Sequence, residues 1–290
     1  MVKKSLVLFI VLAISSVAFG KHPEPIQRGK VAVADQNMAV AAQAAAAAGT
    51  ASVDATATCS YQFTSGGTTT KKFLQYCVTV NGNIVEFQSP SGVENIAVGV
   101  FGEGYSLCDF ASGLGYHDYA GFGDADTGAW GAPSLLQLNA TTVKIARTTT
   151  DGIWTLTQTI QQSSADATAK VTMALKNNTA ISRFVWLARY VDIDAHGTIN
   201  PNTLDGTQNT AFGYLVNNPT DFGLQLSLIA ENGFAHYGFA IPHPAGNPAC
   251  SIGTGFVGTV TGADGSVYFY HGITVKAGKT ATVKLKYSGM

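Results

Sequence analysis

The sequence predicts an all-β protein, a large antiparallel β-sandwich of the supersandwich kind that follows a disordered or loosely helical Ala-rich N-terminal leader. Three observations predict this class. Glycine contributes 32 of 290 residues, and 46% of the chain is hydrophobic while only 12% is charged. After residue 57, apolar and polar residues alternate with a period of two in many segments, which is typical of half-buried antiparallel strands. No helical periodicity follows that point and no strict internal repeat is visible, which argues against a propeller or a solenoid.

The charge balance excludes two classes of protein. The chain carries 17 basic and 18 acidic residues, a formal charge of −1. Binding to nucleic acid depends mostly on neutralising phosphates with Lys and Arg, so no nucleic-acid partner is expected. Low charge combined with many apolar residues also excludes a wholly disordered chain.

The first twenty residues have the three parts of an export signal. Lys3 and Lys4 precede an apolar stretch at 6–14 and small residues at 15–20, which predicts a signal peptide over 1–20 with cleavage before Lys21. The alternative is an uncleaved anchor, but the apolar stretch is shorter than the roughly 20 residues a spanning helix needs. Without Lys3 and Lys4 the chain has 15 basic and 18 acidic residues, a net charge of −3. We expect a secreted, periplasmic or cell-surface protein with no transmembrane segment after cleavage.

Residues 21–57 form the Ala-rich leader. They contain two prolines and then a run of small residues from 31 to 48 with high helix propensity but little bulk to bury. We interpret this segment as a tether. The rest of the chain, 58–290, is predicted to form a single β-sandwich domain.

Three segments carry the clearest strand pattern. Residues 153–160, 168–176 and 280–287 alternate apolar and polar side chains, so that Val171 and Met173, for example, share one face. Turn-forming pairs such as Asn-Gly and Asp-Gly separate segments of this type. An outer-membrane barrel is the structural competitor, and the lysines on the strand faces argue against it.

Four cysteines in an exported chain predict disulfide bonds. Residues 59–63 and 73–77 flank a Ser-Gly-Gly segment that is typical of a hairpin loop. Placing Cys59 opposite Cys77 puts Phe63 opposite Phe73, which favours that pair. Cys108 and Cys250 then form the second bond. A metal site is the alternative, but no Cys-x-x-Cys spacing supports it.

The first candidate site lies between residues 102 and 131, where aromatic and acidic side chains stand among glycines. A long ordered loop of this kind is typical of a binding segment. Aromatic rings could stack on sugars while carboxylates accept hydroxyl hydrogen bonds; alternatively, the rings plug the end of the sandwich and the carboxylates cap turns. The candidate ligand-binding residues are Glu103, Tyr105, Tyr116, His117, Asp118 and Trp130.

The second candidate site lies in residues 183–194. Alternation places Phe184, Trp186, Tyr190, Asp192 and Asp194 on one face. An aromatic stripe that leads into two carboxylates resembles the concave sugar-binding face of large sandwich proteins, although the same face could be the sandwich core. The predicted ligand-binding residues of this site are Trp186, Tyr190, Asp192 and Asp194.

Catalysis is a weaker hypothesis, and no catalytic residue is assigned. The strand repeat places Asp192 and Asp194 about 7 Å apart, a spacing found in inverting carboxylate pairs. If the protein is an enzyme, we expect Asp192, Asp194, His117 and His196 to act as acid and base. No hydrolase elbow, phosphate loop or zinc-type histidine spacing is present.

Calcium is an alternative use for the acidic loops, and no other cofactor is expected. Asp124, Asp126 and Asp205 are the candidate ligands. The segments around them lack the complete EF-hand spacing, so a structural calcium shared between loops is the form that remains open.

Several segments resemble a group of exported bacterial β-sandwich proteins for which no activity is known. The segments are 73–84, 89–96, 102–108, 150–152 and 189–194. The resemblance covers most of the chain after residue 57. It implies an exported β-rich fold and assigns no catalytic residues.

These observations lead to three functional hypotheses. The first is a secreted or cell-surface module that binds carbohydrate, such as an oligosaccharide or a surface glycan, through the aromatic and carboxylate face and the Gly/Tyr/Asp-rich segment. The second is a carbohydrate-active enzyme with epimerase-, lyase- or hydrolase-like chemistry. The third is a structural envelope or matrix protein. Fold class alone does not decide between them.

Overall fold

The computed structural model describes residues 59–65, 73–96, 102–120, 129–163, 167–197, 202–215, 223–229, 233–241, 250 and 259–290. The predicted signal peptide and tether, as well as Asp124 and Asp126, lie outside these residues. The described part of the chain is nearly all strand. Its elements are β1 (Tyr61–Ser65), β2 (Leu74–Val78), β3 (Ile84–Gln88), β4 (Glu103–Asp109), β5 (Leu114–Ala120), β6 (Ser134–Asn139), β7 (Thr142–Thr148), β8 (Trp154–Ser163), β9 (Thr168–Asn177), β10 (Arg183–Asp192), the short 3-10 helix η1 (Ala195–Gly197), β11 (Asn202–Gly206), β12 (Thr210–Leu215), β13 (Gly223–Leu228), β14 (Ala235–Ile241), β15 (Val260–Ala263), β16 (Ser266–Val275) and β17 (Thr280–Gly289).

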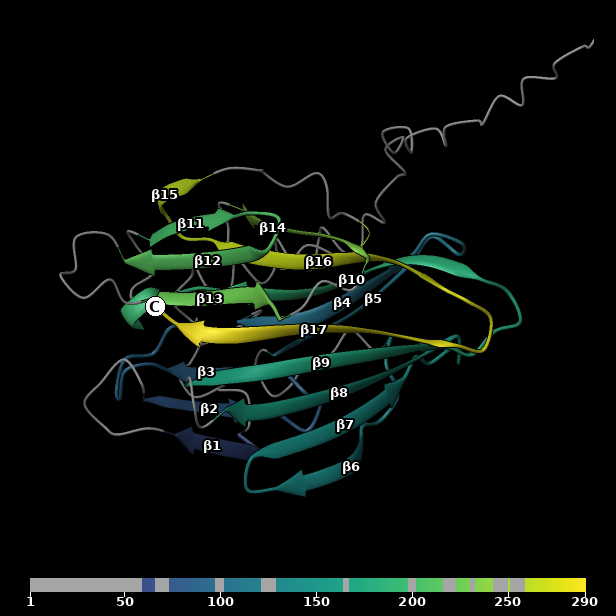
Figure 1. The fold of residues 1–290 in the computed structure, drawn as a ribbon, viewed down its shortest axis with the longest axis horizontal. Helices are drawn as coiled ribbons and strands as arrows, with labels where there is room; N and C mark the ends of the chain where they lie inside the picture. Colours follow the sequence, from purple (N-terminus) through teal and green to yellow (C-terminus); the bar gives the residue numbers. More distant parts are fainter. Residues whose placement is uncertain are drawn as a thin grey trace, which may run out of the picture.

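The strands form three antiparallel sheets. A nine-stranded sheet has the order β15-β11-β12-β13-β17-β9-β8-β7-β6, and a five-stranded sheet has the order β14-β16-β10-β4-β5. Strands β1, β2 and β3 form a small third sheet. Figure 1 shows the nine-stranded sheet spread across the molecule, with the other two sheets behind it. The all-β sandwich predicted from the sequence is confirmed.

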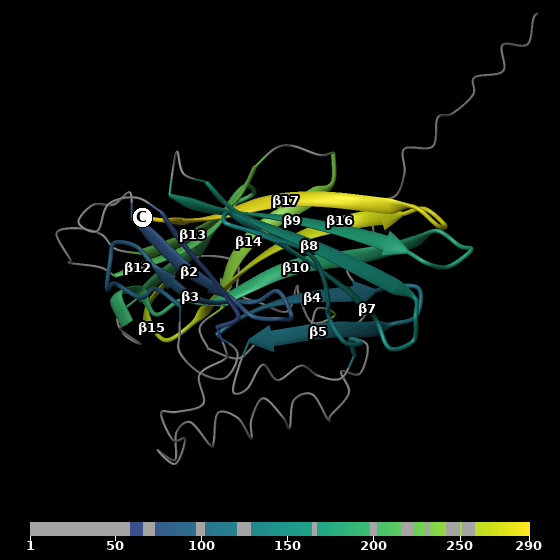
Figure 2. The ribbon, with the colours of Figure 1, turned by 90° about the horizontal axis from the view of Figure 1, so that it is seen from below.

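The main hydrophobic core lies between the large sheet and the two smaller ones. It joins residues such as Leu175 and Val283 of the nine-stranded sheet to Leu187 and Val191 of the five-stranded sheet and to Phe87 of the small sheet. Figure 2 shows the layers from the side, with β4 and β5 on the opposite side of the molecule from β9 and β17. The core therefore occupies the space between two sheets, as in other sandwiches.

The strand alternation read from the sequence matches the observed burial. In β9, Val171, Met173 and Leu175 are at most 1% exposed and face the core, while the residues between them are partly exposed or lie on the opposite face. Strand β17 alternates in the same way along its length. A period of two in the sequence thus places one side of each strand against the other sheet.

The segment at 102–131, expected to be a long loop, contains two strands instead. Strands β4 and β5 pair with each other, and β4 pairs with β10 near the centre of the five-stranded sheet. Gly104 shows why glycines fit here, because a Cβ at this position would lie 2.5 Å from the Tyr119 ring on the neighbouring strand. Gly104 therefore makes room for an aromatic ring on the sheet surface, whereas Gly113, with a φ of 71°, stands in the turn between β4 and β5.

Both predicted disulfide bonds are present, Cys59 with Cys77 and Cys108 with Cys250. The register expected for the first hairpin is wrong. Gln62, not Cys59, lies opposite Cys77, and Phe63 lies opposite Tyr76 rather than Phe73. The rings of Phe63 and Tyr76 stack with centroids 5.2 Å apart, and both are buried. The burial of this aromatic pair fits the observed register.

Two disulfide bonds are typical of proteins that fold in an oxidising environment outside the cytoplasm. In the described part of the chain, no helix is long and apolar enough to cross a membrane.

Candidate functional site

The predicted ligand-binding residues divide between the two faces of the five-stranded sheet and the segment that follows β10. Along β10, Val185, Leu187 and Val191 belong to the main core, whereas Tyr190 belongs to a second hydrophobic cluster with Trp186 packed against it. We call the face toward the nine-stranded sheet the inner face and the opposite one the outer face. The outer-face candidates are His117, Trp186, Tyr190 and Asp192, and the inner-face candidates are Glu103, Tyr105, Tyr116 and Asp118. Trp130 lies outside this sheet, in an isolated bridge with Thr149, and packs against the inner-face rings of Tyr105 and Tyr116.

On the inner face, Glu103 is fully buried and paired. Its carboxylate lies 2.5 Å from Nη2 of Arg189 and accepts hydrogen bonds from Tyr287 Oη at 2.6 Å and from the Ile84 backbone N–H at 2.8 Å. Burial alone would lower the pKa of Arg189, but Glu103 beside it raises that pKa above its usual value. The guanidinium therefore stays charged, and Nη1 also donates to Gln158 Oε1 at 2.5 Å.

Asp118 forms a second ion pair inside the sandwich. Its carboxylate contacts Arg147 of β7, so this pair joins the five-stranded sheet to the nine-stranded sheet. Arg147 Nη1 also donates to Tyr105 Oη at 3.2 Å, and Tyr105 Oη donates to the backbone carbonyl of Asn81 at 3.0 Å. These groups hold the sheets together rather than facing solvent.

Tyr116 and Trp130 complete the inner group. Tyr116 Oη donates to Asp151 at 2.6 Å, and the Tyr116 and Trp130 rings lie 6.2 Å apart. Both side chains are less than 5% exposed. The inner candidates are thus engaged with one another and with core arginines, which leaves them little surface for a ligand.

The outer face of the same sheet carries the exposed aromatic rings. Phe110 lies 4.9 Å from Trp186 and 5.3 Å from Phe184, and Trp186 lies 5.6 Å from Tyr270. Phe184 is 44% exposed, and the others are partly buried. Tyr237 stands directly opposite Tyr270 in the neighbouring strand. We call this set the aromatic face: Phe110, Phe184, Trp186, Tyr237 and Tyr270.

A buried layer of rings adjoins the aromatic face. Tyr190 and Tyr268 are fully buried, with centroids 4.9 Å apart, and Phe239 stacks on Tyr268 at an interplanar angle of 7°. His117 is 8% exposed and packs against Tyr119. Of the outer candidates, Trp186 therefore has ring surface open to a ligand, while Tyr190 contributes to the layer that supports it.

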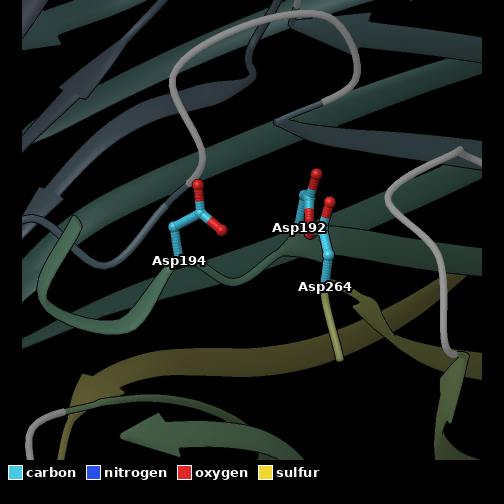
Figure 3. Close-up of side chains that lie close together, drawn as sticks. All are labelled: Asp192, Asp194 and Asp264. Carbon is cyan, nitrogen blue, oxygen red and sulfur yellow. The ribbon is translucent and has the colours of Figure 1, made fainter. Parts of the chain in front are cut away.

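A group of three carboxylates lies where β10 ends. Asp192 is the last residue of β10, Asp194 follows it, and Asp264 comes from the turn between β15 and β16. One oxygen from each residue lies within 4.8 Å of the others. Figure 3 shows Asp264 projecting from this turn toward Asp192, with Asp194 beside them. We call these three residues the carboxylate cluster. Asp194 lies beyond the strand, so the strand repeat does not set its distance from Asp192.

The cluster brings negative charges together with little compensation. Among the described residues, no cation forms an ion pair with these carboxylates. Burial, with the charges of Asp194 and Asp264, raises the pKa of Asp192 well above its ordinary value. Burial, with the charge of Asp264, raises the pKa of Asp194 to about 6. Like charges in a poorly solvated place favour the protonated form.

One hydroxyl connects the cluster to the buried rings. Ser266 Oγ lies 3.3 Å from Tyr190 Oη and 3.4 Å from Asp192 Oδ1. The three carboxylates supply the oxygen ligands that calcium and similar cations prefer, and a carboxyl that holds its proton near pH 6 is suited to acid–base chemistry. Asp205 lies apart, where it accepts a hydrogen bond from Thr259, and the His196 side chain is exposed.

Sequence reasoning missed Asp264, Phe110, Tyr237 and Tyr270. Alternation in 235–241 and 266–275 carries a signal for the two tyrosines, because each stands two residues from another aromatic on the same strand. Asp264 has no such local signal, since a turn far along the chain brings it to Asp192.

Neither a protein family nor a curated protein sequence matches the chain. Solved structures do. A bacterial glucoamylase complexed with acarbose is similar over 81% of this chain with 11% identity and a TM-score of 0.56, and the chain spans about a third of its length, 32%. A putative aldose 1-epimerase from Escherichia coli K12 (12% identity, 79% of this chain and 99% of that one, TM-score 0.41) and an aldose epimerase homologue from C. elegans (8%, 80% and 99%, TM-score 0.46) are also similar. The likeness to the glucoamylase shows a shared fold.

Proposed function

We propose that the protein is a secreted or cell-surface module that binds carbohydrate on its aromatic face. The observation that carries the proposal is the contiguous set of exposed or half-exposed rings around Trp186. Sugar rings present apolar faces that stack on such side chains, while their hydroxyls need polar groups nearby. The hydroxyls of Tyr237 and Tyr270 are on the face itself.

Several features support this role over the alternatives. The rings come from β10, β14, β16 and the turn that follows β4, so the sheet fixes their relative positions. Cys108 lies directly opposite Trp186, and its disulfide to Cys250 anchors the same part of the sheet. The glucoamylase that shares the fold is a carbohydrate-active protein, which fits the proposal at the level of the fold. Export through the predicted signal at 1–20 would bring the module to extracellular or surface glycans.

A glycan array probed with the oxidised, fluorescently labelled chain tests the proposal. We expect binding to one related group of oligosaccharides. Binding to no glycan, in a preparation shown to be folded by near-UV circular dichroism, would contradict the proposal and favour a structural envelope role.

The carboxylate cluster supports a second candidate, a carbohydrate-active enzyme. Asp194 has a pKa of about 6 and lies beside the buried Asp192, so one carboxyl could hold a proton while another is ionised. In this proposal Asp192 and Asp194 exchange protons with a sugar bound nearby. The enzyme is supported if the protein turns over a ligand found on the array and Asp192→Asn abolishes that turnover without loss of binding. Binding without turnover would contradict the enzyme and favour a carbohydrate-binding module.

A further inference from the structure

Strand β6 forms one edge of the nine-stranded sheet, and it is unusually apolar for an edge. Among the described residues it pairs only with β7, and all six of its residues are exposed. Leu135, Leu136 and Leu138 are 49%, 55% and 53% exposed. Edge strands in soluble proteins normally carry charges that prevent pairing with another chain, but β6 contains none.

A β-bulge places two of these leucines on the same face. Leu135 lies opposite Ile145 and Leu138 lies opposite Val143, and the register shifts between Leu135 and Gln137. Ile145 and Val143 are buried residues of the main core. Directly opposed residues point to the same side of a sheet. Leu135 and Leu138 therefore extend the core-facing side of the nine-stranded sheet beyond β7.

The strand is also complementary to itself. If a second β6 runs antiparallel about a two-fold axis between Leu136 and Gln137, then Leu135 lies opposite Leu138 of the second copy, and Ser134 lies opposite its Asn139. Both leucine pairs fall on the core-facing side of the nine-stranded sheet, and no charges of like sign meet along the strand. A two-fold contact of this kind closes after two copies.

We propose that two copies of this chain associate through β6 to form a dimer in which the two nine-stranded sheets become continuous. The open backbone edge supplies the hydrogen bonds, and the leucines supply apolar contact. The self-complementary leucine spacing and the lack of charge favour a second copy over a foreign peptide. Pairing through β6 does not require carbohydrate binding.

Sedimentation velocity of the full chain, followed across a hundred-fold range of concentration, tests the pairing. We expect a reversible dimer. Leu138→Lys and Leu135→Glu should each raise the dimer dissociation constant by about tenfold or more, because a charge replaces one side of each leucine pair. Ile181→Lys, at a residue that is 56% exposed in the turn before β10, should leave the dimer unchanged.

Mixing the two variants tests the register itself. In a mixed dimer, the lysine introduced in one chain would face the glutamate introduced in the other, and the second pair would remain Leu with Leu, so the equimolar mixture should recover the dimer. Thermal melts of each variant establish that it is folded. A wild-type chain that stays monomeric, a dimer that both substitutions leave intact, or a loss that mixing does not restore would overturn the proposal.

Discussion

Trp186 meets Phe110 edge-on, with ring centroids 4.9 Å apart and ring planes at 81°. Trp186 belongs to β10 and Phe110 directly follows the neighbouring strand β4, and a third ring, Tyr270 of β16, lies 5.6 Å from Trp186. Aromatic pairs of this geometry hold each other in place. The half-exposed indole is therefore fixed in position before any ligand arrives, which lowers the entropic cost of binding.

The first prediction concerns the ion pair between Arg189 and Glu103. Replacing Arg189 with Met should reduce the free energy of unfolding by about 3–5 kcal/mol, because Glu103 then lies in the core without a cation and burial, which raises its pKa, disfavours its charged form. Urea unfolding measures this loss. The double variant Arg189→Met with Glu103→Leu should recover part of it, since no buried charge then remains. A single-variant loss below about 1 kcal/mol would show that the pair is not buried as described.

The second prediction concerns the carboxylate cluster. Asp194 has a folded-state pKa of about 6 against an ordinary value of 3.8, so the folded protein holds a proton that the unfolded chain releases. Its contribution to stability is therefore lost as pH rises from about 4 to about 6. Asp194→Asn should raise the unfolding free energy at pH 7 by about 1–3 kcal/mol and leave it unchanged near pH 3.

Asp205→Asn is the matched control, because Asp205 is a partly buried carboxylate outside the cluster. The same pH series on this variant measures what replacing a carboxylate with an amide does outside the cluster. If the pH profile of Asp194→Asn runs parallel to that of the wild type, the three carboxylates do not repel one another in solution.

The third prediction concerns His271, which is fully buried on β16. Neither of its ring nitrogens has a hydrogen-bond partner among the described residues, and burial, with the nearby His236, lowers its pKa to about 3. Between about pH 6.5 and pH 3, His271 binds a proton in the unfolded chain but stays neutral in the folded protein. The free energy of unfolding should therefore fall as pH drops through this range. His271→Leu should reduce that slope in thermal melts.

His196→Asn provides the comparison for this acid limb. His196 is exposed and has a φ of 62°, a conformation that Asn tolerates. The same melts on this variant measure what replacing a histidine does at an exposed position. An unchanged slope in His271→Leu would mean that His271 gains a partner in solution.

The sequence predicts the strands and the first disulfide well because their signals are local, and the second disulfide follows as the remaining pair of cysteines. The alternation in β8, β9 and β17 follows directly from one buried face. The cysteines of the first pair stand on either side of one hairpin, although the register there depends on how Phe63 packs against Tyr76, which spacing does not reveal.

The site is harder to predict because its parts come from distant strands. Sequence alone does not distinguish Glu103, which Arg189 neutralises in the core, from Asp192, which meets two other carboxylates. Nor does it show that Trp186 keeps exposed surface while Tyr190, four residues along the same strand, is fully buried. Both distinctions depend on which strands become neighbours.

Isothermal titration of matched variants with an oligosaccharide found on the glycan array tests the central claim most directly. Trp186→Ala removes a partly buried ring from the aromatic face, and Phe212→Ala removes a ring of the same burial class from β12 of the other sheet. We predict that Trp186→Ala weakens binding at least tenfold, about 1.4 kcal/mol, while Phe212→Ala binds as the wild type does. Equal affinity for all three proteins would contradict a carbohydrate site on the aromatic face.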